Sequence, residues 1–284
     1  MSRGAERDGE KGTDPRLGLC LAGGGGLGFL HIGLLETLEE LGIRPSLAAG
    51  TSMGAVMGAF YAAGVTSKDI RGILADFKWR KLAALTLPHH GLLSTHRMQV
   101  LFREHLGDMD IADLPIRLKI AAMNVRTGQL KQFSEGPLTK CLAASCAVPG
   151  LFEPVTIGGV EYYDAGPVYN LPLELLSGEG KKRIIAGNTI GENGLLEHPR
   201  TIEEVLYQTY LIQMVHQTRW RVGPRGWEGK KDEEVVLVDY HTGGANPARI
   251  EECKALIENT HALSLKVLEK AFGLQKQGKQ PSEA

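Results

Sequence analysis

Residues 17–42 read LGLCLAGGGGLGFLHIGLLETLEELG, with four consecutive glycines between an apolar run and an amphipathic run. The run at 17–22 is typical of a strand buried on both faces of a parallel sheet. In 31–42 apolar residues recur at helical spacing, and Gly42 ends the pattern. Glycine has no Cβ, so another group can approach the main-chain N–H groups between the two elements. The stretch therefore predicts a strand, a loop that holds a ligand, and a helix.

The next segment repeats this arrangement. SLAAG at 46–50 predicts a second strand, and AVMGAFYAAG at 55–64 predicts a helix of small residues that packs tightly. Together the two segments are typical of a right-handed parallel βαβ unit. Further strands or hairpins are expected at 116–133, 155–164, 183–190 and 234–239, and helices at 201–221 and about 248–272. This order predicts one α/β domain with helices on both faces of a mostly parallel sheet.

The composition is that of an ordinary globular domain. The 284 residues are 43% hydrophobic, enough for a sizeable core, and the formal net charge is -1. Such a chain lacks the basic field that nucleic-acid binding normally shows, so nucleic acid is discounted as a partner. The four cysteines form no CxxC pair or regular framework, which predicts reduced thiols in a cytoplasmic protein.

Both ends of the chain are polar. Residues 1–15 are charged and glycine-rich, without the apolar core of a signal peptide or membrane anchor, and residues 273–284 are equally polar. We expect both to be flexible tails on a domain of residues 16–272. No apolar stretch reaches the roughly eighteen residues that span a bilayer, so any membrane contact is expected to be peripheral.

The glycine loop has three candidate ligands: a phosphate, a dinucleotide and an oxyanion. A Walker loop needs Gly-Lys-Ser/Thr after its spacer, whereas residues 28–30 are Gly-Phe-Leu. The glycines at 23, 25 and 28 match the dinucleotide pattern GxGxxG. That site wants an acidic residue after the second strand, where residues 48–50 are Ala-Ala-Gly. A nucleotide-binding oxidoreductase stays as a less favoured alternative.

The second strand ends in GTSMG at 50–54, a GxSxG pentapeptide centred on Ser52. Between a strand and a helix this pattern is typical of a nucleophile elbow, whose sharp turn exposes the serine oxygen. Parallel strands end at the same edge of a sheet, so we expect Ser52 beside the glycine loop. Acyl transfer needs N–H donors about 3 Å from the developing oxyanion. The predicted oxyanion hole consists of the N–H groups of Gly24, Gly25, Gly26 and Met53.

A nucleophilic serine also needs a base. Ordinary α/β-hydrolases place a histidine late in the chain, where His216, His241 and His261 stand, but none of these has distinctive surroundings. Asp164 differs, because it ends the hairpin predicted at 155–164 and precedes a small-small pair that would let a serine approach. On the residues alone, an aspartate base and a histidine base both stay open.

Four motifs occur in order within residues 17–190. They are GGGGLG at 23–28, GTSMG at 50–54, AASCAVPGLFEPV at 143–155 and DAG at 164–166. Together they resemble the patatin-like phospholipase family, especially its compact bacterial members. The resemblance implies a three-layer α/β/α sandwich, lipid acyl esters as substrates, and a catalytic dyad of Ser52 as nucleophile and Asp164 as general base and acid. No metal or organic cofactor is expected.

The chain departs from the family pattern at two positions. The family usually carries Arg or Lys where this chain has Leu27, and DGG where this chain has DAG. Alanine suits the second position provided that Ala165 needs no positive φ. Ser145, in the third motif, is interpreted as structural.

The combined prediction is a cytoplasmic serine acyl hydrolase that acts on phospholipids, lysophospholipids or related esters. The alternative is a lipid-binding or regulatory protein that keeps the fold while its dyad is idle. Residues 77–93 combine Trp79, three basic residues and an apolar run. This composition fits an interfacial flap and a packed connection about equally well.

Overall fold

The computed structural model describes residues 12–78, 91–191, 195–196, 198–222, 232–246 and 249–274. Its strands are β1 (Asp14–Leu21), β2 (Pro45–Thr51), β3 (Gly91–Leu93), β4 (Arg117–Asn124), β5 (Leu130–Phe133), β6 (Gly150–Phe152), β7 (Val155–Ile157), β8 (Val160–Asp164), β9 (Arg183–Asn188) and β10 (Glu234–Asp239). Its α-helices are α1 (His31–Glu40), α2 (Met53–Ala62), α3 (Ser67–Ala75), α4 (His96–Leu106), α5 (Leu138–Cys146), α6 (Gly166–Tyr169), α7 (Ile202–Val222), α8 (Ile250–Ala255) and α9 (Ile257–Phe272), and 3-10 turns cover Gly25–Leu30, Ile111–Asp113 and Leu173–Leu175.

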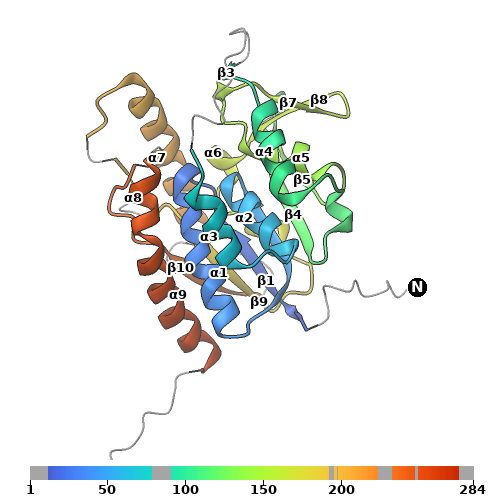
Figure 1. Ribbon diagram of the computed structural model, residues 1–284, viewed down its shortest axis with the longest axis vertical. Coiled ribbons are helices and arrows are strands. Elements are labelled where there is room, and N and C mark those ends of the chain that lie inside the picture. Colours follow the sequence, from blue (N-terminus) through green and yellow to red (C-terminus); the bar gives the residue numbers. More distant parts are fainter. Residues whose placement is uncertain are drawn as a thin grey trace, which may run out of the picture.

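The central sheet is mostly parallel, as predicted (Figure 1). Strands β10, β9, β1, β2 and β4 lie side by side in that order and run parallel to one another. Strands β5 and β8 each pair antiparallel with β4, and β7 completes a hairpin with β8. The hairpins predicted at 116–133 and 155–164 are therefore confirmed. Strands β3 and β6 form a small separate sheet that the sequence analysis did not anticipate.

The side chains of β1 alternate between two apolar layers, because successive residues of a strand point to opposite faces. Leu19 and Leu21 join the core that contains α1, α2, α5 and α9. Cys20 joins a second cluster on the other face, which residues 165–176 supply. The α/β/α layering is confirmed, but the second face is covered by α6 and a 3-10 turn instead of long helices.

The prediction of one continuous C-terminal helix over about 248–272 is wrong. The structure has α8 and α9, which meet at Leu256, whose N–H donates to the carbonyl of Cys253. The two helices differ in their main partners, since α8 packs chiefly on the turn at 25–30 whereas α9 packs chiefly on α1. A Cβ at Gly33 of α1 would lie 2.6 Å from the Ile257 carbonyl oxygen of α9. This close packing buries α1 on more than the one side predicted from its spacing.

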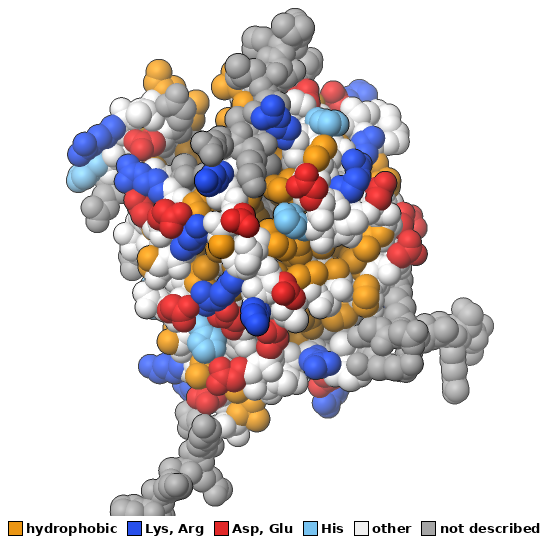
Figure 2. All heavy atoms as spheres, viewed as in Figure 1, with side chains coloured by type: hydrophobic (Ala, Val, Ile, Leu, Met, Phe, Trp, Pro, Cys, Tyr) orange, Lys and Arg blue, Asp and Glu red, His pale blue; other side chains and the backbone are white. Residues whose placement is uncertain are grey.

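The described surface carries charges of both signs. Figure 2 shows basic and acidic side chains interspersed over the face in view. Within the described ranges, no helix combines the length and the apolar character needed to cross a bilayer. All four cysteines are buried and unpaired. Most of the tail predictions, at 1–11 and 275–284, and residues 79–90 of the flap prediction lie outside the described residues.

Candidate active site

Ser52 occupies a strained turn between β2 and α2. Its φ of 55° and ψ of -129° make it the non-glycine residue with positive φ in the described part of the chain. Such a conformation costs on the order of 1–3 kcal/mol and is typical of functional sites. A Cβ at Gly50 would lie 2.5 Å from the carbonyl carbon of Gly54, and one at Gly54 would clash with the carbonyl oxygen of Leu21. Both glycines of the pentapeptide are therefore required by close approach of the backbone.

Ser145 ties the backbone of Ser52 to β4. The Ser52 N–H donates to Ser145 Oγ at 2.8 Å, and Ser145 Oγ donates to the carbonyl of Ala121 at 2.6 Å. Ser145 is fully buried. These contacts agree with the structural role predicted for this serine, because its hydroxyl is used in holding the turn.

Strand β4 brings Ser52 and Asp164 together. Thr51, the last residue of β2, pairs with Ala121, and Asp164, the last residue of β8, pairs with Ala122. Strand β5 pairs with residues 120–123 along the other edge of β4, so β2 and β8 share one edge. The two strands approach each other end to end along that edge. Ser52 and Asp164 consequently meet where both strands stop.

The Asp164 carboxyl is buried without a charged partner. The residue is 1% exposed, its Oδ1 accepts the Gly166 N–H at 2.7 Å, and its Oδ2 has no hydrogen-bond partner among the described residues. Burial raises the pKa of this carboxyl from its usual 3.8 to about 6, while Ser52, the Gly166 N–H and Tyr210 oppose that rise. A carboxylate of this kind is a stronger base than an exposed one.

The glycine loop lies against this turn. Gly24 and Gly25 have φ of 147° and 56°, which point their N–H groups in directions that other residues rarely allow. Among the described residues, the N–H groups of Gly24, Gly25, Gly26 and Met53 donate to no acceptor. A Cβ at Gly28 would clash with the Met53 side chain, so the loop packs directly on the start of α2. The predicted donors are thus free and close to the elbow.

Two residues that the sequence analysis missed hold the loop at Gly23. Thr189 Oγ donates to the Gly23 carbonyl, and the Gly23 N–H donates to the Asn170 carbonyl at 3.2 Å. A Cβ at Gly23 would lie 3.1 Å from Ser52 Cβ and 2.9 Å from Asn170 Oδ1. The one sequence signal for Asn170 was its place shortly after the DAG motif, and Thr189 had none.

Several buried polar side-chain atoms have no hydrogen-bond partner among the described residues, and some of them lie at this site. Within the described ranges they are Asp164 Oδ2, both amide atoms of Asn170, Tyr210 Oη and the hydroxyl oxygens of Thr218, Thr242 and Ser264. Asn170 adjoins the loop beside Ser52, and Tyr210 Oη adjoins Gly166 and Asp164. Buried polar groups are normally hydrogen-bonded, and unpaired ones lower the stability of a fold. Their presence beside Ser52 is typical of a functional site.

The histidines considered as bases are exposed or bonded to another residue. His216 and His241 are exposed, and His261 pairs with Glu40 at 3.0 Å. His31 is fully buried, but its ring nitrogens are engaged by Tyr240 Oη and the Ala22 carbonyl, each at 2.8 Å. No group of His, Cys, Asp and Glu among the described residues is arranged to hold a metal ion. The backbone pairing places Asp164 beside Ser52, whereas these histidines are exposed or bonded to other residues.

Both departures from the family pattern fit the structure. Ala165 has φ of -82°, an ordinary right-handed conformation, so the DAG motif needs no glycine at its second position. Leu27 is fully buried in the main core. An apolar side chain therefore suits the position where the family usually carries a basic residue.

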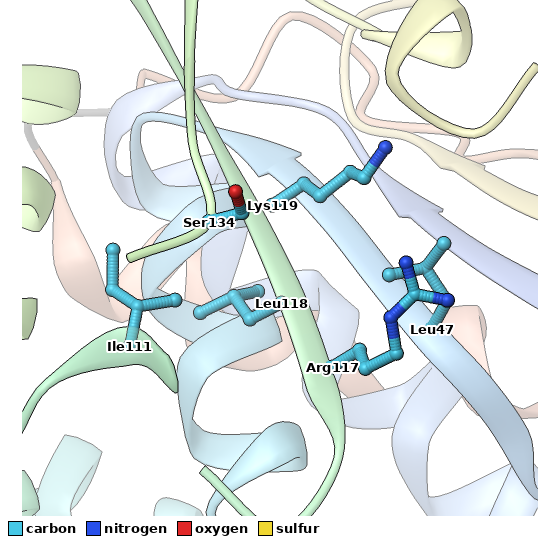
Figure 3. Close-up of a pocket in the computed structure, with 6 residues that line it drawn as sticks. All are labelled: Leu47, Ile111, Arg117, Leu118, Lys119 and Ser134. Carbon is cyan, nitrogen blue, oxygen red and sulfur yellow. The ribbon is translucent and has the colours of Figure 1, made fainter. Parts of the chain in front are cut away.

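A small cavity lies near the amino ends of β2 and β4, away from the end of the sheet that carries Ser52. It has a volume of about 50 Å³ and is lined by Leu47, Ile111, Arg117, Leu118, Lys119 and Ser134 (Figure 3). Arg117 and Lys119 both pair with Glu179, at 2.7 and 2.8 Å. Since Leu47 pairs with Arg117 at the start of β4, this cavity is separated from Ser52 by the length of β2. It does not belong to the site.

Known proteins share the sequence and the fold. A family model described as patatin-like phospholipase matches residues 19–177. An uncharacterized NTE family protein of Mycobacterium tuberculosis is 31% identical over 209 residues, which cover 72% of this chain and 57% of the relative. Lysophospholipase NTE1 of Debaryomyces hansenii is 31% identical over 180 residues, which cover 61% of this chain and 12% of that protein.

The crystal structure of VipD from Legionella pneumophila supports the fold. Its TM-score is 0.59 at 14% sequence identity, with 95% of this chain and 71% of that chain covered. The matched regions make up 57% of the Mycobacterium tuberculosis protein and 12% of the Debaryomyces hansenii protein, so this chain spans only part of the length of these curated relatives. Because the family model matches more than half of the 284 residues, the chain belongs to the patatin-like phospholipase family.

Proposed function

We propose that the chain is a serine acyl hydrolase that cleaves lipid acyl esters through a Ser52–Asp164 dyad. The observation that carries the proposal is the end-to-end approach of β2 and β8 along β4, with a buried and unpaired Asp164 Oδ2 at the junction. Family membership supports a lipid ester as the substrate, and the lysophospholipase among the relatives favours phospholipids and lysophospholipids. Such substrates reside in membranes or micelles, so the proposal includes peripheral contact with a lipid surface.

In the first half of the reaction, the Asp164 carboxylate accepts the proton of Ser52 Oγ as this oxygen bonds to the ester carbonyl carbon. The carbonyl electron pair moves to its oxygen, and the free N–H groups of the glycine loop and Met53 stabilise the charge. The N-terminus of α2 adds a favourable dipole. The carbon–oxygen bond to the alcohol then breaks, and the departing alkoxide takes the proton from Asp164.

In the second half, Asp164 accepts a proton from water, and the resulting hydroxide attacks the acyl-enzyme carbonyl. The second oxyanion collapses by expelling Ser52 Oγ, which recovers its proton from Asp164. The products are the fatty acid and the free enzyme. A carboxyl with a pKa of about 6 serves both halves, because it is mostly ionised at neutral pH and yet returns its proton readily.

The test is a fluorophosphonate probe combined with a panel of acyl esters that includes phospholipids and lysophospholipids. We expect covalent labelling at Ser52 and ester turnover, both abolished in Ser52→Ala. Labelling that persists in Ser52→Ala would reject the proposed nucleophile. A folded wild-type protein that binds lipid vesicles but neither labels nor hydrolyses any ester would support the idle lipid-binding alternative instead.

A further inference from the structure

Helix α7 lies along α6, the short helix that begins directly after Asp164 and Ala165. Gln217 Nε2 donates to the Gly166 carbonyl at 2.7 Å, and Arg221 Nη2 donates to the Val168 carbonyl at 3.0 Å. Positions 210, 214, 217 and 221 fall on one face of a helix, so these bonds turn Tyr210 and Met214 toward the same segment. This helix lies beyond residues 19–177, which the family model matches.

The Tyr210 hydroxyl and the Asp164 carboxyl share a space that glycine leaves open. A Cβ at Gly166 would lie 2.8 Å from Tyr210 Oη and 3.2 Å from Asp164 Oδ1, and it would clash with Met214. Tyr210 Oη and Asp164 Oδ2 are both buried without a hydrogen-bond partner among the described residues. One is a donor and the other an acceptor. The Tyr210 hydroxyl can therefore donate the hydrogen bond that Asp164 Oδ2 lacks.

We propose that Tyr210 is a positioning residue whose hydroxyl donates a hydrogen bond to the ionised Asp164 carboxylate and thereby sets the pH range in which Asp164 acts as a base. The inference rests on the role of Asp164 in the proposed function. A hydrogen bond to the charged form of a carboxyl favours that form, so Tyr210 counteracts the burial of Asp164.

Among the described residues, four other groups face Asp164, and two of them, Ser52 and the Gly166 N–H, also favour its carboxylate, so the proposed effect of Tyr210 adds to theirs. The four groups are Ser52 from the elbow, Cys146 from α5, Tyr207 from α7 and the N–H of Gly166. Burial raises the pKa of Cys146 and of Tyr207, so both stay neutral near pH 7. Ser52 also favours the carboxylate, but it gives its proton away in the reaction. Tyr210 keeps its proton, because burial raises the pKa of its phenol well above the usual 10.

The first test is the pH profile of kcat/KM for Tyr210→Phe, which removes one oxygen and keeps the ring. We expect the acid limb to move upward by about one pH unit, which means about tenfold lower activity below the limb and near wild-type activity above pH 8. Tyr207→Phe is the matched control, since its ring stacks on that of Tyr210 with centroids 6.1 Å apart. Its acid limb should not move.

A purely structural role of Tyr210 would lower activity at every pH and leave the limb in place, and that result would overturn the proposal. An equal shift in Tyr207→Phe would overturn it as well. Each outcome is read against the same wild-type profile.

The second test does not depend on activity. Carbon-13 NMR of labelled aspartate side chains, with the Asp164 signal assigned by its loss in Asp164→Asn, follows the carboxyl as pH changes. We expect Asp164 to titrate about one unit higher in Tyr210→Phe than in the wild type, and an identical titration would reject the proposal. If the titration shifts but the wild-type protein neither labels nor hydrolyses esters, the proposed function fails while the interaction stands.

Discussion

Two buried centres of the molecule contain the same kinds of group, but the polar atoms are hydrogen-bonded in one and, among the described residues, unpaired in the other. In one, a Cβ at Gly187 would lie 2.5 Å from Tyr240 Oη and 2.9 Å from His31 Nδ1. In the other, a Cβ at Gly166 would meet Tyr210 Oη and Asp164 Oδ1. Each centre thus consists of a glycine, a tyrosine hydroxyl and a titratable side chain.

The His31 centre is complete. Since the Ala22 carbonyl can only accept, His31 Nε2 donates to it, and Nδ1 accepts from Tyr240. At the Asp164 centre, Oδ2 and Tyr210 Oη make no hydrogen bond to any described residue. A satisfied buried network stabilises a fold, whereas an unsatisfied one raises the free energy of the resting state. The fold therefore holds the start of the glycine loop with satisfied hydrogen bonds at His31 and leaves polar atoms unpaired at Asp164 within the described part of the chain.

The largest expected effect is that of Asp164→Asn on turnover. The amide preserves the shape of the side chain but cannot accept the serine proton, so we expect a loss of about a thousandfold or more. Steady-state hydrolysis of the preferred ester measures it, with circular dichroism as the control for folding. Substantial turnover in this variant would move the proton chemistry away from the Asp164 centre.

The two centres should respond to pH with opposite signs. Burial lowers the pKa of His31 from 6.5 to about 4, so its contribution to stability is present above pH 6.5 and is lost as pH falls through 4. Burial raises the pKa of Asp164 from 3.8 to about 6, so its contribution is present below pH 3.8 and is lost as pH rises through 6. Each change is about 3 kcal/mol.

Urea unfolding across pH 4–8 measures these changes. At pH 8, Asp164→Asn should have a larger free energy of unfolding than the wild type. A pH dependence that is the same in Asp164→Asn and in the wild type would show that Asp164 does not titrate between pH 4 and 8.

The glycine loop joins the two centres, and Gly25→Val tests its part in the reaction. Gly25 has φ of 56°, which a branched side chain resists, so the N–H groups should leave the oxyanion position. We expect turnover to fall by about a hundredfold or more. Gly42→Val is the control, because Gly42 has a similar φ of 64° and a Cβ at that position would face open space, with nothing within 4 Å. Equal turnover in both variants would remove the loop from the mechanism.

A smaller effect is expected for Tyr240→Phe, measured by urea unfolding at pH 7. It leaves His31 Nδ1 buried without a partner, which should lower the free energy of unfolding by about 1–3 kcal/mol. At pH 5, where His31 is still neutral but Asp164 is mostly protonated and lacks the carboxylate to which Tyr210 is proposed to donate, Tyr210→Phe should change it much less than Tyr240→Phe. If both variants lose the same stability at pH 5, the difference between the two centres disappears.

The smallest effects are expected for His216→Ala, His241→Ala and His261→Ala. These side chains are exposed or paired with Glu40, so each variant should keep turnover within about tenfold of the wild type. Loss of a triad base would cost about a thousandfold or more. One folded and inactive variant among the three would replace the dyad with an ordinary triad.

Much of the framework was predictable because its causes are local. The apolar run of β1, the glycines after it and the pentapeptide around Ser52 lie within 17–54, and each pattern reports a backbone requirement of its own residues. The division of the C-terminal helix at Leu256 was not predictable, since α8 and α9 differ in their packing partners and not in local spacing. Tyr210, Asn170 and Thr189 likewise reach the site through tertiary contacts, so the local sequence around them gave almost no sign of a functional role.

Local patterns of residues were enough to predict the parallel sheet, the glycine loop, the elbow at Ser52 and the family motifs, because strand period, glycine geometry and turn chemistry act between near neighbours in the chain. Which polar groups lie together depends instead on packing between distant segments. The pairing of Thr51 with Ala121 and of Asp164 with Ala122 joins segments far apart in the chain. Burial of Asp164 and the approach of Tyr210 from α7 follow from that packing, and the proposed proton chemistry depends on both.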